Sequence, residues 1–360
     1  MMHLSNLSRV IPNHLAIAET SQQRLNSLQA LRGIAALMVV AFHLNVYTLP
    51  ENLGLNPTWP GLNMGYAGVE IFFVLSGFIM FYRHGTELGQ PKKLVPYLYA
   101  RFARIFPVFW MVLVMVMTLR FIVYDTLPTA QSILISASML PIFDQHILGI
   151  QWTLSFELMF YIIFGLAFFN VRLGLVLMMI WFGVCIVLIL MGQTGELPIF
   201  FFSPYNILFL LGIIAATTWQ NVNDIAVPLL LTGIALFIGV GLSEALGFVD
   251  YNFAIRTVFY GVGAMAMICA AVSLESQGRP RVPTTMVFLG NASYAIYLVH
   301  ITARGAVSLV FKKIVLTDLP TNALALLVFV SAVCVGAATH ILLEKPTIRF
   351  LRRWRPESGQ

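Results

Sequence analysis

Apolar residues occur along this chain in long runs separated by short polar segments. About 20 apolar residues in a helix are enough to cross the ~30 Å hydrocarbon core of a bilayer. One further apolar segment, at 131–140, is too short to cross and is expected to lie on the surface or to fold back. The pattern predicts ten transmembrane helices, of which the sixth and seventh are short, near 28–48, 64–82, 103–124, 151–170, 173–192, 204–219, 226–243, 255–275, 285–307 and 321–343.

The composition strengthens this prediction. Of the 360 residues, 59% are hydrophobic and only 10% are charged, and the mean hydropathy is +0.85, whereas soluble domains carry ~25% charged residues. We therefore expect an all-α, polytopic integral membrane protein without internal repeats. Its transmembrane domain would cover 26–345, between an N-terminal tail at 1–25 and a basic C-terminal tail at 346–360. The N-terminal tail shows no apolar stretch or cleavage site typical of a signal peptide.

The distribution of basic residues predicts the orientation. Most of the 21 Lys and Arg residues lie in the two tails and in the segments 83–104 and 278–281, whereas 49–63, 125–150 and 193–203 contain none. Because cytoplasmic loops carry the excess of Lys and Arg, both termini are expected to be cytoplasmic. An even number of spans also requires both termini to share one side. The net charge of +6 is thus explained by topology, and we expect no nucleic-acid partner.

The three cysteines, Cys185, Cys269 and Cys334, all lie inside apolar runs and have no metal-binding spacing. They are expected to be buried, inert thiols. We expect neither a disulfide framework nor a metal site.

The stretch LRGIAALMVVAFHL at 31–44 places Arg32 and His43 in one apolar span. Eleven residues correspond to roughly 1100° of helical rotation, within ~20° of whole turns, and to a rise of ~16.5 Å. Both side chains therefore share one face of the helix. Exposure of either side chain to lipid would cost free energy, so this face is expected to point into the protein or into a water-filled cavity.

Other polar groups fall into two predicted layers. His43, Glu70, Glu157 and His300, from four different spans, are expected ~8–10 Å below the outer surface. Each alone is also explained as a helix–helix hydrogen-bonding residue or a structural partner. Near the cytoplasmic side, Arg32 is joined by Arg101 and Arg104, whose i, i+3 spacing puts them on one helix face. Such arginine pairs often serve as topology anchors or lipid contacts.

Several motifs resemble the membrane acyltransferase 3 family, bacterial integral-membrane enzymes that O-acylate cell-surface sugars. The resemblance covers roughly residues 25–350 and includes the Arg32–His43 spacing and the Arg101–Arg104 pair. Two departures are that Glu70 replaces the usual Asp and that Ser155–Phe156–Glu157 replaces Ser-Val-Glu. The segments that show the resemblance are LQALRGIAALMVVAFHL, GVEIFFVLSGFIM, YARFARIFPVFW, WTLSFELMFY and SYAIYLVH.

The resemblance implies a multi-pass protein of the bacterial inner membrane that moves an acyl group, acetyl in the first instance, from acyl-CoA to a sugar hydroxyl. His43 would be the general base, because imidazole titrates near working pH. Glu70, or failing that Glu157, would fix its tautomer. Arg101 and Arg104, with Arg32 as a further contact, would bind the donor phosphates. The acceptor would be an exported polysaccharide or a lipid-linked glycan, and membrane lipids would be further partners.

Two alternatives stay open. Buried Arg, His and Glu also mark transport pathways, so a transporter or flippase of lipid-linked sugars fits the polar residues. Such proteins usually show matching inverted halves, and 28–170 does not match 204–343 convincingly. The acceptor could also be peptidoglycan or a small metabolite. The sequence does not identify the acceptor, the acyl group or the oligomeric state. It also does not decide whether the acyl group is transferred directly or through an acyl-enzyme intermediate.

Overall fold

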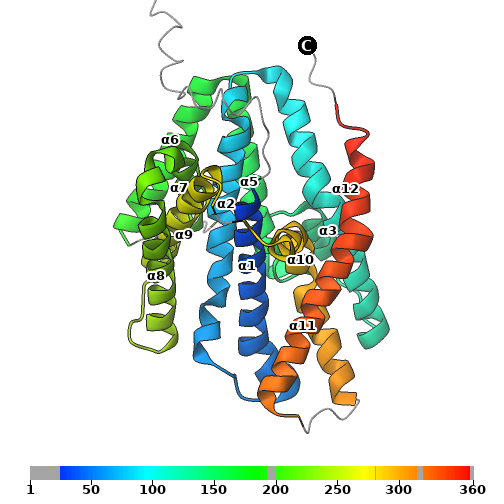
Figure 1. The fold of residues 1–360 in the computed structure, drawn as a ribbon. Helices are drawn as coiled ribbons and strands as arrows, with labels where there is room; N and C mark the ends of the chain where they lie inside the picture. The colour runs from blue at the N-terminus through cyan, green and yellow to red at the C-terminus, as the bar shows by residue number, and fades with distance from the viewer. Residues whose placement is uncertain (1–24, 193–199, 280, 314–318, 357–360) are drawn as a thin grey trace, which may run out of the picture.

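The structure, a computed structural model, describes residues 25–192, 200–279, 281–313 and 319–356. Within them the chain is all-helical, as the apolar pattern predicts (Figure 1). The predicted N-terminal tail lies outside the described residues except at Leu25. The α-helices are α1 Asn26–His43, α2 Gly68–His84, α3 Leu94–Tyr124, α4 Ala130–Ser138, α5 Gln151–Phe169, α6 Val171–Leu190, α7 Tyr205–Thr218, α8 Ala226–Ala245, α9 Phe253–Ser276, α10 Thr284–Lys313, α11 Thr321–Thr339 and α12 Lys345–Arg352.

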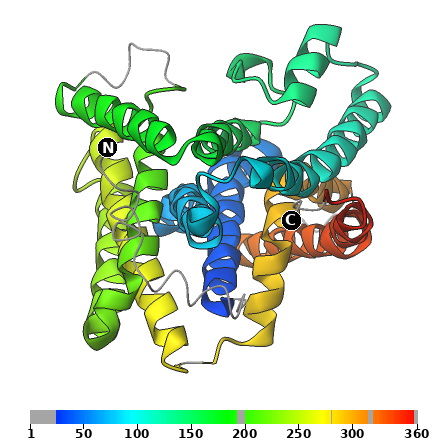
Figure 2. The same ribbon diagram turned by 90° about the horizontal axis from the view of Figure 1, so that it is seen from above.

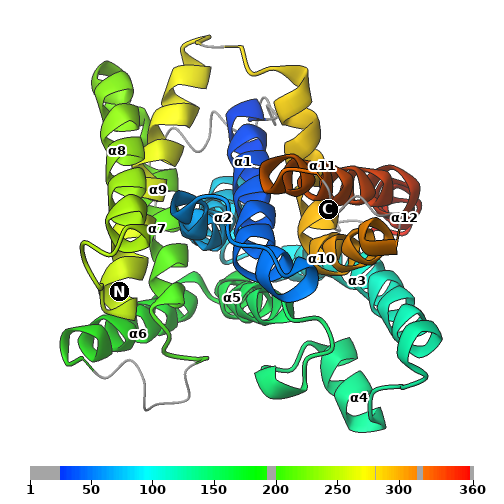
Figure 3. The ribbon, with the colours of Figure 1, turned by 90° about the horizontal axis from the view of Figure 1, so that it is seen from below.

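Shorter helices extend or join these elements. A π-helix, η4 Leu44–Leu53, continues α1, and a 3-10 helix, η5 Pro60–Ala67, precedes α2. Another π-helix, η11 His340–Glu344, joins α11 to α12. The predicted short apolar segment forms α4, which lies at the periphery in Figure 3.

Nine helical segments within the described ranges are long and apolar enough to cross a membrane. One of them, Tyr205–Ala245, is 41 residues long and combines α7 and α8 through the 3-10 helix η9 Trp219–Ile225. Both ends of this segment contact the start of α9: the ring of Tyr205 lies 5.2 Å from that of Phe253, and Glu244 forms an ion pair with Arg256. The chain therefore reverses between α7 and α8, so this segment makes two passes and each predicted span corresponds to a helix.

Helices α1 and α2 lie at the centre of the bundle, between α7, α8 and α9 on one side and α10, α11 and α12 on the other (Figure 2). Aromatic side chains from α2, α5 and α7 form much of the main core, in which the Phe160 and Phe209 rings stack 4.3 Å apart. A second cluster between α1, α10 and α11 consists mostly of small residues, including Ala36, Ala292 and Ala332. Small side chains let membrane helices approach closely, which favours dispersion contacts.

Helices α1 and α10 run parallel and pack along most of their length. At one end Gly33 faces Leu289 and Gly290, and a Cβ atom on Gly290 would lie 1.9 Å from the carbonyl oxygen of Gln29. Farther along the same pair, His43 contacts His300. This parallel register brings the Arg32–His43 face against residues of α10.

The segments predicted to be cytoplasmic gather at one end of the bundle. Glu275, at the end of α9, accepts hydrogen bonds from the backbone N–H groups of Asn26 and Ser27, at 2.8 and 2.9 Å, and so caps α1. The Tyr99 hydroxyl near the start of α3 donates to the Leu351 carbonyl of α12. The start of α1, the end of α9, the start of α3 and the C-terminal helix therefore share one side.

The expectation that all three cysteines are buried is wrong for one of them. Cys185 and Cys269 are buried, but Cys334 is exposed. It lies on α11, whose outer face is turned away from the bundle. An apolar run marks a membrane helix without showing which of its faces meets lipid, because lipid and protein interior are both apolar.

Candidate functional site

A histidine pair lies between α1 and α10. The Nδ1 atom of His43 lies 3.3 Å from Nε2 of His300 and 2.9 Å from the carbonyl oxygen of Val39. His300 is fully buried, whereas His43 is partly exposed. Nδ1 of His300 in turn lies 2.5 Å from the Tyr297 carbonyl oxygen.

These contacts assign the tautomers of both rings. A carbonyl oxygen only accepts hydrogen bonds, so Nδ1 of His300 carries the proton donated to Tyr297, and its Nε2 presents a lone pair. Nδ1 of His43 likewise carries a proton, which Val39 and His300 both accept. The unprotonated nitrogen of a neutral His43 is therefore Nε2. A backbone carbonyl and a second imidazole thus hold His43 in the tautomer that leaves Nε2 available as a base.

Arg304 lies one turn beyond His300 on α10. Its Nη1 atom donates to the His43 carbonyl oxygen at 3.3 Å and to the Thr48 hydroxyl at 2.5 Å. The ring of Tyr47 stacks on that of His43 with centroids 5.7 Å apart. Together these contacts fix the backbone and one ring face of His43 and put a positive charge beside it.

Arg32 lies on the same face of α1, ~16.5 Å of helical rise away from His43. Its Nε atom donates to the Ser293 hydroxyl of α10 at 3.3 Å. Arg104, Glu157 and Glu344 are all close enough to act on Arg32 electrostatically. The α1–α10 seam, the interface between the face of α1 that carries Arg32 and His43 and the face of α10 that carries Ser293 and His300, therefore has a cluster of charged groups at its Arg32 end. These groups come from α1, α3, α5 and η11.

Arg101 and Arg104 bring two positive charges to the inner part of the bundle. The guanidinium carbon of Arg101 lies 6.0 Å from the ring centre of Tyr97 and 5.6 Å from that of Tyr161, within cation–π range. Its buried Nε atom has no hydrogen-bond partner in the part of the chain that the structure describes. Within the described ranges neither arginine forms an ion pair. A pair of this kind can take an anion.

Glu157 belongs with these arginines, not with His43. It accepts hydrogen bonds from the hydroxyls of Ser76, at 2.8 Å, and Tyr161. No hydrogen bond joins it to His43 in the described part of the chain. The expectation that Glu157 shares the depth of His43 is therefore wrong, because Glu157 acts electrostatically on Arg32 and its partner Ser76 lies about two turns beyond Gly68, which packs against Ala35 and Val39 of α1.

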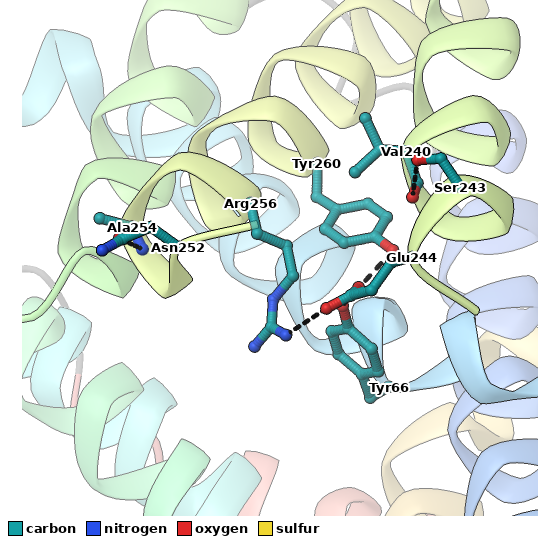
Figure 4. Close-up of polar contacts among 8 residues, drawn as sticks. All are labelled: Tyr66, Val240, Ser243, Glu244, Asn252, Ala254, Arg256 and Tyr260. Carbon is teal, nitrogen blue, oxygen red and sulfur yellow. Dashed lines mark hydrogen bonds and ion pairs between the residues drawn. The ribbon is translucent and has the colours of Figure 1, made fainter. Parts of the chain in front are cut away.

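Glu70 also fails to reach His43. It is buried on α2, and neither of its carboxylate oxygens has a hydrogen-bond partner among the described residues. Its electrostatic neighbours include Arg256 and Glu244. In Figure 4 Glu244 lies between the guanidinium of Arg256, at 2.6 Å, and the hydroxyl of Tyr66. The predicted pairing of Glu70 with His43 is therefore not formed, and Glu70 faces a separate polar cluster between α2, α8 and α9.

The family comparison matches residues 25–341 to the acyltransferase domain. The chain belongs to the acyltransferase domain family. This confirms the resemblance drawn from the Arg32–His43 and Arg101–Arg104 motifs, and it makes the protein a multi-pass membrane acyltransferase.

Two relatives are similar in sequence. The exopolysaccharide production protein ExoZ of Rhizobium meliloti (strain 1021) is 30% identical over 312 residues, which cover 82% of this chain and 93% of ExoZ. Protein 2 in the picA locus of Rhizobium radiobacter is 30% identical over 95 residues, or 26% of this chain and 44% of that protein. No solved structure matches the chain.

Sequence reasoning placed His300 near His43 in depth but gave it no role, and it missed Ser293, Tyr161 and Arg304 as members of the site. The spacing of polar residues along α10 could have identified Ser293 and Arg304. Ser293 and Arg304 are eleven residues apart, as Arg32 and His43 are, so each pair lies on one helix face. Two parallel helices with the same polar period are expected to pair their polar faces.

Proposed function

We propose that this acyltransferase moves an acyl group from cytoplasmic acyl-CoA to a hydroxyl of an exported polysaccharide or lipid-linked glycan. The acceptor class follows from similarity to ExoZ, whose name records a role in exopolysaccharide production. The donor follows from the family and from the unpaired guanidinium groups of Arg101 and Arg104, which suit phosphate. Acetyl-CoA is the donor to be tested first.

The observation that carries the proposal is the 2.9 Å contact between Nδ1 of His43 and the carbonyl oxygen of Val39, which assigns the tautomer of His43. With Nδ1–H held by the Val39 carbonyl, Nε2 accepts the proton of the acceptor hydroxyl as its oxygen attacks the thioester carbonyl. The tetrahedral intermediate then collapses and expels the CoA thiolate, which recovers the proton from the imidazolium. The products are an ester and free CoA.

In this mechanism the carbonyl of Val39 takes the positioning role that an acid plays in a triad. The positive charge of Arg304, beside His43, would offset the negative charge of the tetrahedral oxyanion. Along α1, this site lies ~16.5 Å from Arg32. A thin pantetheine arm would span that distance, with its phosphates near Arg101 and Arg104 and its thioester near His43.

The test is transfer of an isotopically labelled acetyl group. Purified protein in lipid nanodiscs is incubated with labelled acetyl-CoA and deacylated exopolysaccharide, and the glycan is examined by mass spectrometry. We expect labelled ester and an equal amount of free CoA, both abolished by His43→Gln. The same assay is repeated with lipid-linked glycan, peptidoglycan fragments and small metabolites as acceptors. If none of these acceptors and no polysaccharide is labelled, and the protein moves lipid-linked sugar across vesicle membranes, the protein is a flippase and the proposed function is wrong.

A further inference from the structure

A small cavity opens at the end of the bundle that the charge pattern predicts to be cytoplasmic. It has a volume of about 320 Å³ and is lined by residues of α2, the α2–α3 connection, α3 and the segment after α12. This volume lies within the ~300–1,000 Å³ range of small-molecule sites. Its polar lining residues are His84, Glu87, Lys93, Tyr97 and Arg355.

The charges in the cavity suit an anion. Lys93, in the 3-10 helix η7 Pro91–Lys93, and Arg355, after α12, both act electrostatically on Glu87. Glu87 is in addition bonded to His84, whose Nδ1 atom lies 2.5 Å from its carboxylate. Two cations thus share the cavity with a single carboxylate that is already partnered, and the surplus charge is positive.

His84 supplies an independent sign of a ligand. Its side chain is only 11% exposed, and its buried Nε2 atom has no hydrogen-bond partner among the residues that the structure describes. A buried polar atom without a partner destabilises the protein, because it has lost its hydrogen bonds to water. With Nδ1–H directed to Glu87, protonation makes Nε2 a second donor, and an anionic oxygen in the cavity would satisfy it.

The cavity adjoins the arginine pair. The ring of Tyr97 lines it, lies 5.1 Å from the ring of His84, and lies 6.0 Å from the guanidinium carbon of Arg101. A molecule in the cavity is therefore separated from Arg101 by one aromatic ring. The cavity therefore lies next to the arginine proposed to bind the donor phosphates.

We propose that this cavity binds the phosphate-bearing nucleotide end of the acyl donor, with Lys93, Arg355 and His84 as its phosphate contacts. The inference rests on the proposed function, because it takes acyl-CoA as the donor. Arg101 and Arg104 would then hold the diphosphate–pantetheine junction, one step nearer the membrane. The C-terminal segment thereby becomes part of the donor site.

The test compares acetyl-CoA with acetyl-pantetheine, which has the same thioester but no nucleotide. For the double variant Lys93→Ala/Arg355→Ala we expect KM for acetyl-CoA to rise roughly 10- to 100-fold. Its KM for acetyl-pantetheine and its kcat with either donor should stay at the wild-type values. Arg353→Ala removes an exposed neighbouring charge outside the cavity and should change neither KM. Lys93→Arg should restore part of the affinity in the Arg355→Ala background.

Unchanged KM for acetyl-CoA, or equal losses with both donors, would overturn the assignment of the cavity while leaving the proposed function intact. An anionic lipid headgroup is the other source of such a phosphate. If the effect of the double variant appears only in phosphatidylglycerol nanodiscs and vanishes in phosphatidylcholine nanodiscs, the cavity holds lipid, and the inference is wrong. A wild-type protein that neither binds CoA by calorimetry nor uses either donor would overturn both proposals together.

Discussion

Nε2 of His300 lies 3.3 Å from Nδ1 of His43, although 257 positions separate the two residues in the chain. With Val39 as a second acceptor, this contact holds the proton on Nδ1 of His43. The contact exists because α1 and α10 are parallel and in register from Gln29–Gly290 to His43–His300. The proposed base therefore depends on the packing of two helices from opposite ends of the sequence.

The first prediction concerns His43 as the base. His43→Gln keeps a hydrogen-bonding side chain but cannot take the proton, so kcat should fall by ~10²–10⁴-fold. CoA affinity, measured by calorimetry in detergent, should remain at the wild-type value, because Arg101 and Arg104 lie at the other end of the seam. Turnover like that of the wild type in His43→Gln would exclude His43 as the base.

The second prediction concerns His300 as the partner of His43. His300→Ala removes one of the two acceptors of Nδ1–H and leaves the Val39 carbonyl. A single neutral hydrogen bond contributes ~0.5–1.5 kcal/mol, so kcat should fall only about 2- to 10-fold. The control is His146→Ala, in the loop between α4 and α5. A loss as large as that of His43→Gln would instead make His300 the base.

The third prediction concerns the donor arginines. Arg101→Ala and Arg104→Ala should each weaken acetyl-CoA binding roughly 10- to 150-fold, because each removes a charge-assisted contact worth ~1.5–3 kcal/mol. Binding is measured by calorimetry. Arg120→Ala, an exposed arginine on the same helix, is the matched control. If both variants bind acetyl-CoA with the affinity of the wild type, the arginine pair does not bind the donor and serves as a topology anchor.

The fourth prediction concerns the close approach of α1 and α10. Gly290→Ala would place a Cβ atom 1.9 Å from the Gln29 carbonyl oxygen, so the backbones must separate. We expect a loss of about 1–3 kcal/mol in stability, seen as a lower Tm. Gly305→Ala on the same helix meets nothing closer than 3.9 Å and is the control. Equal Tm values for the two variants would contradict the tight packing at Gly290.

The fifth prediction concerns the side on which the loops lie. A phosphatase reporter, active only outside the cytoplasm, should be inactive when fused within residues 83–104 and active when fused near residue 55. The expectation follows from the basic residues of the first segment and their absence from 49–63. The reverse pattern would put the arginine pair and the proposed nucleotide cavity on the wrong side for a cytoplasmic donor.

The sequence alone determined the helices, the family and the two residues at the ends of the α1 face. Runs of apolar residues decide where a chain crosses a bilayer, because the hydrocarbon core forces every backbone group into internal hydrogen bonds. Helical periodicity decides that Arg32 and His43 share a face. Both properties are local, so they can be read from one segment at a time.

Only the tertiary structure decided the partners of those residues. The sequence predicted that Glu70 and Glu157 lie at the depth of His43, yet Glu70 faces Arg256 and Glu244, and Glu157 bonds to Ser76 and Tyr161. Depth along a span does not specify the direction in which a side chain points around the helix axis relative to other helices. That direction is set by packing such as the Gln29–Gly290 contact, which joins residues more than 250 positions apart and leaves no mark in either local pattern.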